Sequence, residues 1–267
     1  MNILFLGDIF GKPGREILKR NLKNLRKEFS IDMCIANFEN LADGKGVTEK
    51  TAKIAFSYGV DFATGGNHLW SKSESLSFIS KERRICRPAN YPRPEVGREF
   101  ITADVDGHSV TILNLVGQNF MTPANSPFFK ADEILDCINS KIIIVDFHAE
   151  ATAEKRALAW HLDGRVSALF GTHTHIQTAD EEILPQGTGY ITDVGMTGGH
   201  DSVIGIRKEI ILSKMRDGLY RPYLVANRGL QINGIVVEVD NNTGKTLKIK
   251  RVRRCFNGED SKSKTSN

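Results

Sequence analysis

The stretch Gly171-Thr-His-Thr-His175 follows an apolar run from Val166 to Phe170, and the fold of the chain can be worked out from it. The apolar run predicts a buried strand, with two histidines standing one residue apart at its end. In an extended segment His173 and His175 would share one face, whereas a helix would separate them by roughly 200°. Two imidazoles on one face suit two neighbouring metal ions. The alternative is an ordinary strand end with polar side chains toward solvent. Ligand-type residues at the ends of other strands would favour the metal site.

The composition is that of an ordinary globular protein. Of the 267 residues, 40% are hydrophobic and 25% are charged, which is enough for one large core. We expect a single domain over residues 1–256 and a polar, disordered tail over residues 257–267. No apolar run approaches the roughly 20 residues of a membrane span, and the first eight residues lack the basic start of a signal peptide. These features predict a cytoplasmic protein without a membrane partner.

Cysteine spacing and net charge argue against two further classes of protein. The four cysteines are far apart, form no CxxC pair and lie within or beside apolar runs. This pattern is typical of buried, reduced thiols and predicts no disulfide framework. The net charge of +4 is small, so it does not by itself indicate nucleic-acid binding. The four residues are Cys34, Cys86, Cys137 and Cys255.

Strands and helices alternate in the first third of the chain. Apolar runs predict strands over residues 2–7, 32–37 and 61–64, and a helical segment follows each of them. Pro13 lies near the start of the first helix, and Thr48 is expected to cap the second. Three successive strand–helix units favour a mostly parallel sheet, and therefore the α/β class.

An antiparallel element follows in the middle of the chain. Two alternating runs joined by Asp106-Gly107-His108 predict a hairpin. The loop over residues 117–129 is either a flap beside the substrate or an ordinary surface loop. The remaining expected elements are helices over 131–138, 151–162 and 203–215, strands over 141–147 and 190–194, a glycine-rich turn over 195–202, and a closing hairpin of 231–239 with 246–253.

Polar residues of the metal-ligand type stand directly after five of the predicted strands. In an open α/β sheet the carboxyl ends of the strands gather at one edge, where ligands bind. Imidazole, carboxylate and amide donors without a thiolate favour Mn, Fe or Zn over Mg or Ca. Taken singly, Asp8 could be a cap, Asn67 a turn former and His148 a core histidine, but their recurrence favours a site for two metals. The residues are Asp8, Glu39, Asn40, Asn67, His68, His148, His173 and His175.

These residues resemble the calcineurin-like dinuclear metallophosphoesterases. Two sequence motifs of that family end in GNH and in GHxH. Gly66-Asn67-His68 and Gly171-Thr-His-Thr-His175 occur in that order, with His148 between them. The chain departs from the superfamily at Asp8-Ile9-Phe10, where a second ligand histidine is missing, and at Phe38-Glu39-Asn40, where Gly-Asp is usual. Both departures are similar to those of one subgroup, the YmdB-like 2′,3′-cyclic nucleotide phosphodiesterases. Further motifs of this subgroup are Gly7-Asp8-Ile-Phe-Gly11, His148-Ala-Glu-Ala151 and Asp193-Val-Gly-Met-Thr-Gly198.

The resemblance implies a fold, a ligand set and a cofactor. The fold is an αββα sandwich, with two mixed β-sheets flanked by helices and the metal site at the carboxyl ends of strands. Glu39 would bridge two divalent transition-metal ions, which would be Fe or Mn, with Zn as the alternative. Asp8, Asn40 and His175 would complete one site, and the other would contain Asn67, His148 and His173. Asn40 can supply the neutral donor that the histidine missing at position 10 would have given.

The resemblance also implies an activity. The expected reaction is hydrolysis of 2′,3′-cyclic nucleotides, such as 2′,3′-cAMP, to nucleoside monophosphates through a metal-bridging hydroxide. His68 follows a predicted ligand directly, and we assign it as the acid that protonates the leaving ribose oxygen. Alternatives are a broader phosphomonoesterase or 3′,5′-cyclic diesterase, and a regulatory RNA-associated protein that binds a nucleotide with little turnover. The family resemblance further implies a homo-oligomer.

Two weaker features remain. Residues 245–254 carry five basic side chains beyond Lys245, which could contact RNA, although charges on an edge strand also prevent edge-to-edge pairing, and we favour that explanation. His200 and Asp201 lie in the glycine-rich segment, where they could either bind substrate or form a turn. We keep them as weak candidates for substrate binding.

Overall fold

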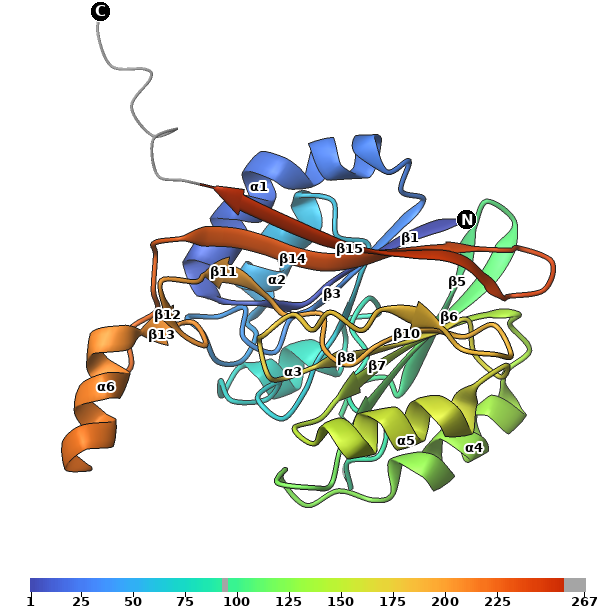
Figure 1. Ribbon diagram of the computed structural model, residues 1–267. Helices are drawn as coiled ribbons and strands as arrows, with labels where there is room; N and C mark the ends of the chain where they lie inside the picture. The colour runs from blue at the N-terminus through green and yellow to red at the C-terminus, as the bar shows by residue number, and fades with distance from the viewer. Residues whose placement is uncertain (93–95, 257–267) are drawn as a thin grey trace, which may run out of the picture.

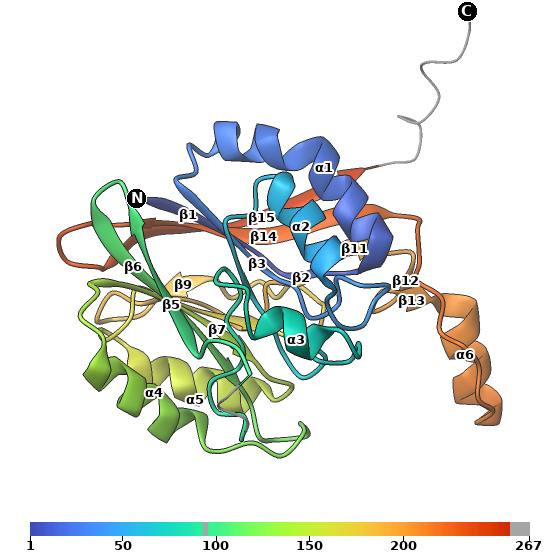
Figure 2. The same ribbon diagram turned by 180° about the vertical axis from the view of Figure 1, so that it is seen from behind.

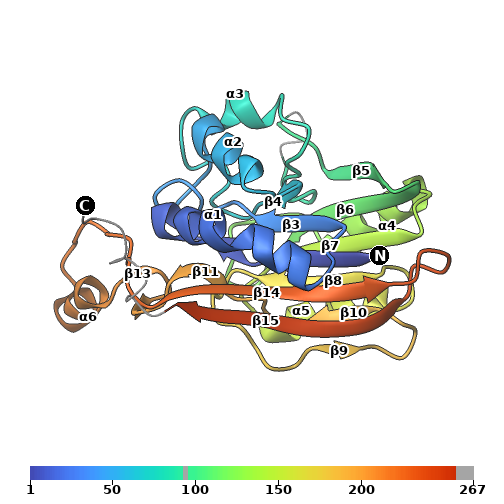
Figure 3. The same ribbon diagram turned by 90° about the horizontal axis from the view of Figure 1, so that it is seen from above.

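Two β-sheets packed face to face form the centre of the molecule. The computed structural model describes residues 1–92 and 96–256, and the expected tail lies outside these residues. Helices cover the outer face of each sheet, so that the layers run helix, sheet, sheet, helix (Figures 1 and 2). Figure 3 looks down on the seven-stranded sheet, with α1 lying across it. Both sheets contain parallel and antiparallel strands. The predicted αββα sandwich is confirmed.

The first sheet has seven strands and contains both ends of the described chain. Its order is β2-β11-β14-β1-β3-β4, and β15 pairs with β14 as well. Strands β1, β3 and β4 run parallel, as the three strand–helix units predict, whereas β14 of the closing hairpin is antiparallel to β1 and to β15. The bounds are β1 (Asn2–Leu6), β2 (Asp8–Ile9), β3 (Met33–Asn37), β4 (Phe62–Thr64), β11 (Met196–Gly199), β14 (Leu230–Val239) and β15 (Thr246–Phe256).

The second sheet has six strands in the order β5-β6-β7-β8-β10-β9. Strands β6, β7, β8 and β10 are parallel, so their carboxyl ends share one edge. The expected hairpin of β5 and β6 is present, with Asp106 and Gly107 both at positive φ in its turn. The bounds are β5 (Phe100–Val105), β6 (His108–Val116), β7 (Ile142–His148), β8 (Ala168–Thr172), β9 (Glu182–Ile183) and β10 (Gly189–Ile191).

Three apolar layers hold the sandwich together. Helices α1 (Gly11–Glu28) and α2 (Glu49–Ser57) cover the seven-stranded sheet, and α4 (Pro127–Cys137) and α5 (Thr152–Leu162) cover the other (Figures 1 and 2). The short α3 (Ser75–Ile79) contributes Phe78 and Ile79 to the first layer. Between the sheets, Phe5 and Phe170 lie with ring centroids 5.3 Å apart. Thr48 caps α2, as predicted, by accepting a hydrogen bond from the amide of Thr51.

The glycine-rich segment after residue 194 is the place where the sequence prediction is most in error. The pattern predicts a turn, but the segment contains β11, which pairs with both β2 and β14. A Cβ at Gly199 would lie 2.3 Å from the carbonyl oxygen of Ala226, so the glycine is needed for close approach of two backbones. The helix expected from residue 203 starts at Lys208, because β12 (Ser202–Val203) and β13 (Ile206–Arg207) form a small hairpin first. Helix α6 (Lys208–Asp217) projects from the body (Figures 1 and 2).

Two smaller expectations are also inexact. Helix α4 begins at Pro127, so the last three residues of the expected loop 117–129 are helical. Cys34 and Cys86 are buried, but Cys137 and Cys255 are exposed, because they lie at the end of α4 and on the outer strand β15. All four thiols are free, as predicted. Within the described part of the chain, no helix combines the length and the apolar character needed to span a membrane.

Candidate metal centre

The carboxyl ends of strands from both sheets meet at one place, and ligand-type side chains gather there. Asp8 follows β1, Glu39 and Asn40 follow β3, and His148 is the last residue of β7. Their side chains are buried, with at most 1% of each residue exposed. The remaining members of the set lie in the loops after β4 and β8, namely Asn67, His68, His173 and His175.

One half of the cluster forms around His148. Its Nε2 atom lies 3.1 Å from Oε2 of Glu39 and 3.0 Å from Oδ1 of Asn67. The Nδ1 atom of His173 lies 3.1 Å from the same Nε2 atom. The potential ligand atoms of Glu39, His148 and His173 all fall within 4.8 Å of one another, so one ion could contact all three.

The other half of the cluster forms around Asp8. Nε2 of His175 lies 3.7 Å from Oδ1 of Asp8, and these two residues form a second group of ligand atoms with Glu39, all within 4.8 Å of one another. Nδ2 of Asn40 lies 3.1 Å from His175 Nε2 and donates to Glu39 Oε1. Because an amide's nitrogen and oxygen are nearly equal in shape, turning this amide would place an acceptor there. Glu39 is therefore common to both groups.

The strand end that carries His173 and His175 differs from the sequence prediction. Strand β8 stops at Thr172, and both histidines have positive φ, 101° and 66°, so they do not share one face of a strand. The irregular loop is fixed by other contacts. Asp8 Oδ2 accepts a hydrogen bond from the amide of His173, and His175 Nδ1 lies 2.9 Å from the carbonyl oxygen of Ile204. The sequence contains only a weak signal for this backbone, because non-glycine residues seldom adopt positive φ, although histidine does so more often than most of them.

The charges at the site indicate a place for cations. Burial by itself would raise the pKa of Asp8 and of Glu39, but the imidazoles of His175 and His148 outweigh it and hold both pKa values below their usual range. Although burial opposes the charged imidazole, the Glu39 carboxylate raises the pKa of His148 to about 9. Buried carboxylates need positive partners, and oxygen and nitrogen donors in this arrangement suit divalent transition metals.

His68 lies at the open side of the cluster. Its backbone amide donates to Glu39 Oε2 at 3.0 Å, and its Nδ1 atom is 3.2 Å from Oδ1 of Asn40. About a third of its side chain, 34%, is exposed. The imidazole is thus in contact with two predicted ligands and with solvent, where a substrate would approach.

Five wholly buried polar residues around the cluster were not among the predicted site residues. Asp146 stands within the apolar run of β7, two residues before His148, and a lone carboxylate in such a run was the one signal for it. Burial raises the pKa of Asp146 to about 7. Lys155 of α5 donates to Asp193 at 2.8 Å, which in turn accepts from the amide of Thr174 between the two loop histidines. The five residues are Asn37, Asp146, Lys155, Thr172 and Asp193, each 0% exposed.

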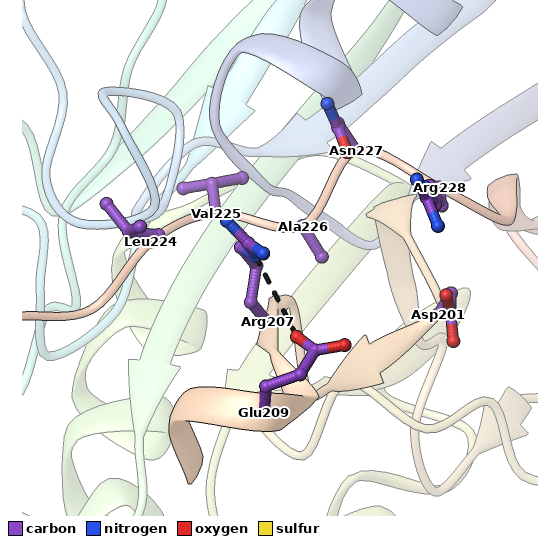
Figure 4. Close-up of a pocket in the computed structure, with 8 residues that line it drawn as sticks. All are labelled: Asp201, Arg207, Glu209, Leu224, Val225, Ala226, Asn227 and Arg228. Atoms are coloured by element: carbon purple, nitrogen blue, oxygen red, sulfur yellow. Dashed lines mark ion pairs between the residues drawn. The ribbon is translucent and has the colours of Figure 1, made fainter.

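The two weak substrate candidates make no hydrogen bond to the predicted ligands among the described residues. His200 Nε2 lies 3.0 Å from the carbonyl oxygen of Met196, and Asp201 pairs with Lys208. Asp201 lines a pocket of about 540 Å³ beside α6, where Arg207 and Glu209 form an ion pair (Figure 4). None of the predicted metal ligands lines this pocket.

Three of the five basic side chains on β15 are paired with acidic residues of the chain itself. Lys248, Arg251 and Arg254 form ion pairs with Glu238, Glu181 and Glu28. These pairs favour the explanation that the charges prevent edge-to-edge strand pairing over the explanation that they contact RNA.

Two stacked mixed sheets, helices on both outer faces and an acid–histidine cluster at the strand ends define the metallophosphoesterase class of protein. The sequence profile of the YmdB-like protein family matches residues 4–252. The chain therefore belongs to the YmdB-like family, as the resemblance of its motifs predicts.

Relatives and solved structures agree with this membership. The chain is 42% identical over 254 residues to the 2′,3′-cyclic-nucleotide 2′-phosphodiesterase of Bacillus subtilis (strain 168), covering 94% of this chain and 96% of the relative. A hypothetical protein from Thermus thermophilus superimposes with a TM-score of 0.91 at 36% identity, over 96% of this chain and 99% of that one. A Mycoplasma pneumoniae protein described as a novel phosphatase gives 0.92 at 36% identity, over 96% and 93%.

Proposed function

We propose that the protein is a metal-dependent phosphodiesterase that hydrolyses 2′,3′-cyclic nucleotides to nucleoside monophosphates. The observation that carries the reaction type is the position of Glu39, whose carboxylate is common to two groups of ligand atoms. Two divalent ions sharing one carboxylate form a site typical of phosphoester hydrolysis. The substrate class is supported by the relative from Bacillus subtilis, whose sequence matches nearly the whole chain.

The proposed ligand set follows the two halves of the cluster. Glu39 would be shared by two ions, and Fe or Mn is favoured over Zn. Asp8, Asn40 and His175 would hold one ion, and Asn67, His148 and His173 would hold the other. The groups of ligand atoms around Glu39 support this division, because His175 belongs to one group and His148 with His173 to the other.

The residues of the site then divide the chemical work. When bound, the two ions lower the pKa of water and stabilise charge on the phosphoryl oxygens. Asp8 and Glu39 supply two negative charges, about half of what two divalent ions carry, so the site keeps an attraction for an anionic diester. His68, which contacts Glu39 and Asn40 and is partly exposed, donates a proton to the ribose oxygen as the P–O bond breaks.

Replacing Glu39 with Gln tests the bridging role. The variant keeps the shape but loses the charge that both groups share, so we expect turnover of 2′,3′-cAMP to fall at least about 100-fold. Metal content, measured by elemental analysis, should fall as well. Glu49→Gln, on the exposed start of α2, is the matched control. Turnover equal to that of the unaltered protein would reject the bridging role.

Replacing His68 with Gln tests the proposed acid. Turnover should fall by roughly 10²–10⁴-fold, because the leaving oxygen loses its proton donor. Metal content should persist, since His68 is not assigned as a ligand. His161→Gln, which alters a histidine paired with Asp132 on the surface, should change neither quantity. Loss of metal from the His68 variant would show that the imidazole is a ligand instead.

A panel of substrates separates the proposal from its alternatives. Metal ligands define the reaction type better than they define the alcohol, so 2′,3′-cyclic, 3′,5′-cyclic and monoester substrates should be compared. Preference for a monoester or a 3′,5′-cyclic substrate would favour the broader phosphatase or diesterase. Binding of 2′,3′-cAMP without metal-dependent turnover would favour a regulatory nucleotide-binding protein.

A homo-oligomer is also part of the proposal. The exposed side chains of Leu212 and Met215 on α6 support it, because a partner subunit could cover them. Analytical ultracentrifugation measures the oligomeric state.

A further inference from the structure

Four wholly buried polar side chains lie directly beneath the ligand cluster. Asn37 and Thr64 end strands β3 and β4 of the seven-stranded sheet, whereas Asp146 and Thr172 lie on β7 and β8 of the six-stranded sheet. Each of the four is 0% exposed. Asp146 is at the centre, and the hydrogen bonds that it accepts join the two sheets.

Asp146 is held by donors from both sides. Its Oδ2 atom accepts hydrogen bonds from Asn37 Nδ2, at 3.0 Å, and from the hydroxyl of Thr64. Its Oδ1 atom accepts a hydrogen bond from the hydroxyl of Thr172 at 2.7 Å. A carboxylate without solvent contact is costly to bury, and here three hydrogen-bond donors offset part of that cost.

The bond from Thr172 determines the hydrogen on His148. Thr172 Oγ1 lies 2.8 Å from His148 Nδ1. Because the single hydrogen of this hydroxyl is donated to Asp146, the oxygen can only accept from the imidazole, and Nδ1 must carry a hydrogen. The lone pair of neutral His148 is then on Nε2, the atom that faces Glu39 and Asn67. This is the tautomer that a metal ligand requires.

The bond from Asn37 reaches the shared carboxylate. Asn37 gives one amide hydrogen to Asp146 and another to the carbonyl oxygen of Gly65. Its Oδ1 atom accepts a hydrogen bond from the backbone amide of Glu39 at 2.9 Å. The direction of Asn37 is therefore fixed by Asp146, and the start of the loop that carries Glu39 is fixed by Asn37.

We propose that Asp146 is a positioning residue. Through Thr172 it sets the tautomer of His148, and through Asn37 it aligns Glu39. One carboxylate thereby holds proposed ligands from both sheets in position. The inference rests on the proposed function in taking Glu39 and His148 as ligands. If the role of Asp146 and its partners were only structural, packed apolar side chains would serve as well. Such side chains often replace buried polar groups at little cost in the free energy of unfolding.

The test uses the hydroxyl of Thr172, which can be removed without changing side-chain shape. Thr172→Val removes the acceptor for His148 Nδ1, and Thr172→Ser restores it. Thr111→Val is the control for loss of a buried hydroxyl. Thr111 lies on β6 of the same sheet, donates to Ser140 in the loop before β7, and makes no hydrogen bond to the predicted ligands among the described residues. Zinc affinity of the full chain is measured by calorimetry, and the Nδ1 proton of His148 is followed by NMR in the zinc-loaded protein.

The expected result is a pattern across the three variants. Thr172→Val should weaken zinc binding by about 10–100-fold, the usual effect of removing a partner of a ligand histidine, and should lose the protected Nδ1 proton. Thr172→Ser and Thr111→Val should stay within about threefold of the unaltered protein and keep that proton. Asp146→Asn should act in the same direction as Thr172→Val, because its amide can turn NH₂ toward Thr172 and reverse the hydrogen bond to His148.

Two outcomes would overturn the inference. One is zinc affinity of Thr172→Val equal to that of the unaltered protein with the Nδ1 proton retained, and the other is equal loss in Thr172→Ser and Thr172→Val. Should Thr172→Val fail to fold, the comparison of Asp146→Asn with Thr172→Ser gives the same decision. Failure of the proposed function would look different. In that case the unaltered protein would bind zinc no more tightly than the Glu39→Gln variant does.

Discussion

At Gly66 a single hydrogen atom separates the backbone from two of the proposed ligands. A Cβ added there would lie 2.3 Å from Oε2 of Glu39 and 2.4 Å from Nε2 of His148. These distances are far shorter than any van der Waals contact, so both side chains would have to move. The glycine of the GNH motif is therefore required by the close approach of Glu39 and His148 and not by its backbone conformation.

The substitution Gly66→Ala should disable the site. We expect turnover to fall at least about 100-fold, because a displacement of about 1 Å at reacting groups has this effect. Metal content should fall with it. The comparison is Gly198→Ala, whose added methyl group would lie 3.1 Å from Phe10 Cβ and at no positive φ, and which should retain more activity. Equal activity of the two variants would contradict this explanation of Gly66.

The residues of the cluster were easier to predict than the residues that hold them in place. Asp8, Glu39 and His148 stand beside apolar runs, and the rule that strand ends gather at one edge places them together. Asp146 lies inside such a run, where the alternation of a strand gives no sign of its partners on β3, β4 and β8. Hydrogen bonds between distant segments depend on the packing of two sheets, which no local pattern encodes.

The loop after β8 is fixed by a helix on the outside of the sheet. Lys155 of α5 and Asp193 form an ion pair of 2.8 Å, and both are 0% exposed. Asp193 also accepts from the amides of Thr174 and Gly195. The same carboxylate therefore secures the backbone between the two loop histidines and the segment that leads into β11.

Removing the cation of this pair should destabilise the protein. Lys155→Met leaves a buried carboxylate without its partner, and we expect the free energy of unfolding to fall by about 3–5 kcal/mol. Urea unfolding measures this change. Lys53→Met breaks an exposed pair with Glu49 on α2 and should cost less than about 1 kcal/mol. A similar small cost for Lys155→Met would mean that the pair does not support the loop.

The same region shows where element prediction fails. The fragment Met196–Gly199 contains two glycines and little hydrophobic pattern. It still forms β11, because its backbone pairs with β2 on one side and with β14 on the other. Strands such as β1, β3 and β7, with nearly continuous burial, were predicted to within one or two residues. Local pattern suffices for strands that supply their own apolar faces, and fails for one whose place depends on its neighbours.

At the scale of the whole molecule, the proposed metal centre lies between two sheets that are also joined by apolar packing and by the hydrogen bonds of Asp146. The proposed ligands Asp8 and Glu39 come from the seven-stranded sheet, and the proposed ligands His148 and His173 lie at strand ends of the six-stranded sheet. An ion that binds across this junction binds only the folded state, because the donors are far apart along the chain. Metal binding should therefore be coupled to global stability.

Removal of metal should lower the melting temperature of the whole protein. At a free ion concentration 100 times the dissociation constant, binding adds about 2.7 kcal/mol to the free energy of unfolding. For a chain of this size that corresponds to roughly 5–10 °C, measured by calorimetry before and after treatment with a chelator. Glu39→Gln, which should bind metal weakly, is expected to show a much smaller difference. If the chelator left the unaltered protein's melting temperature unchanged, the ions would not bridge the sheets, and the cluster of Asp8, Glu39 and the histidines would need another source of compensating charge.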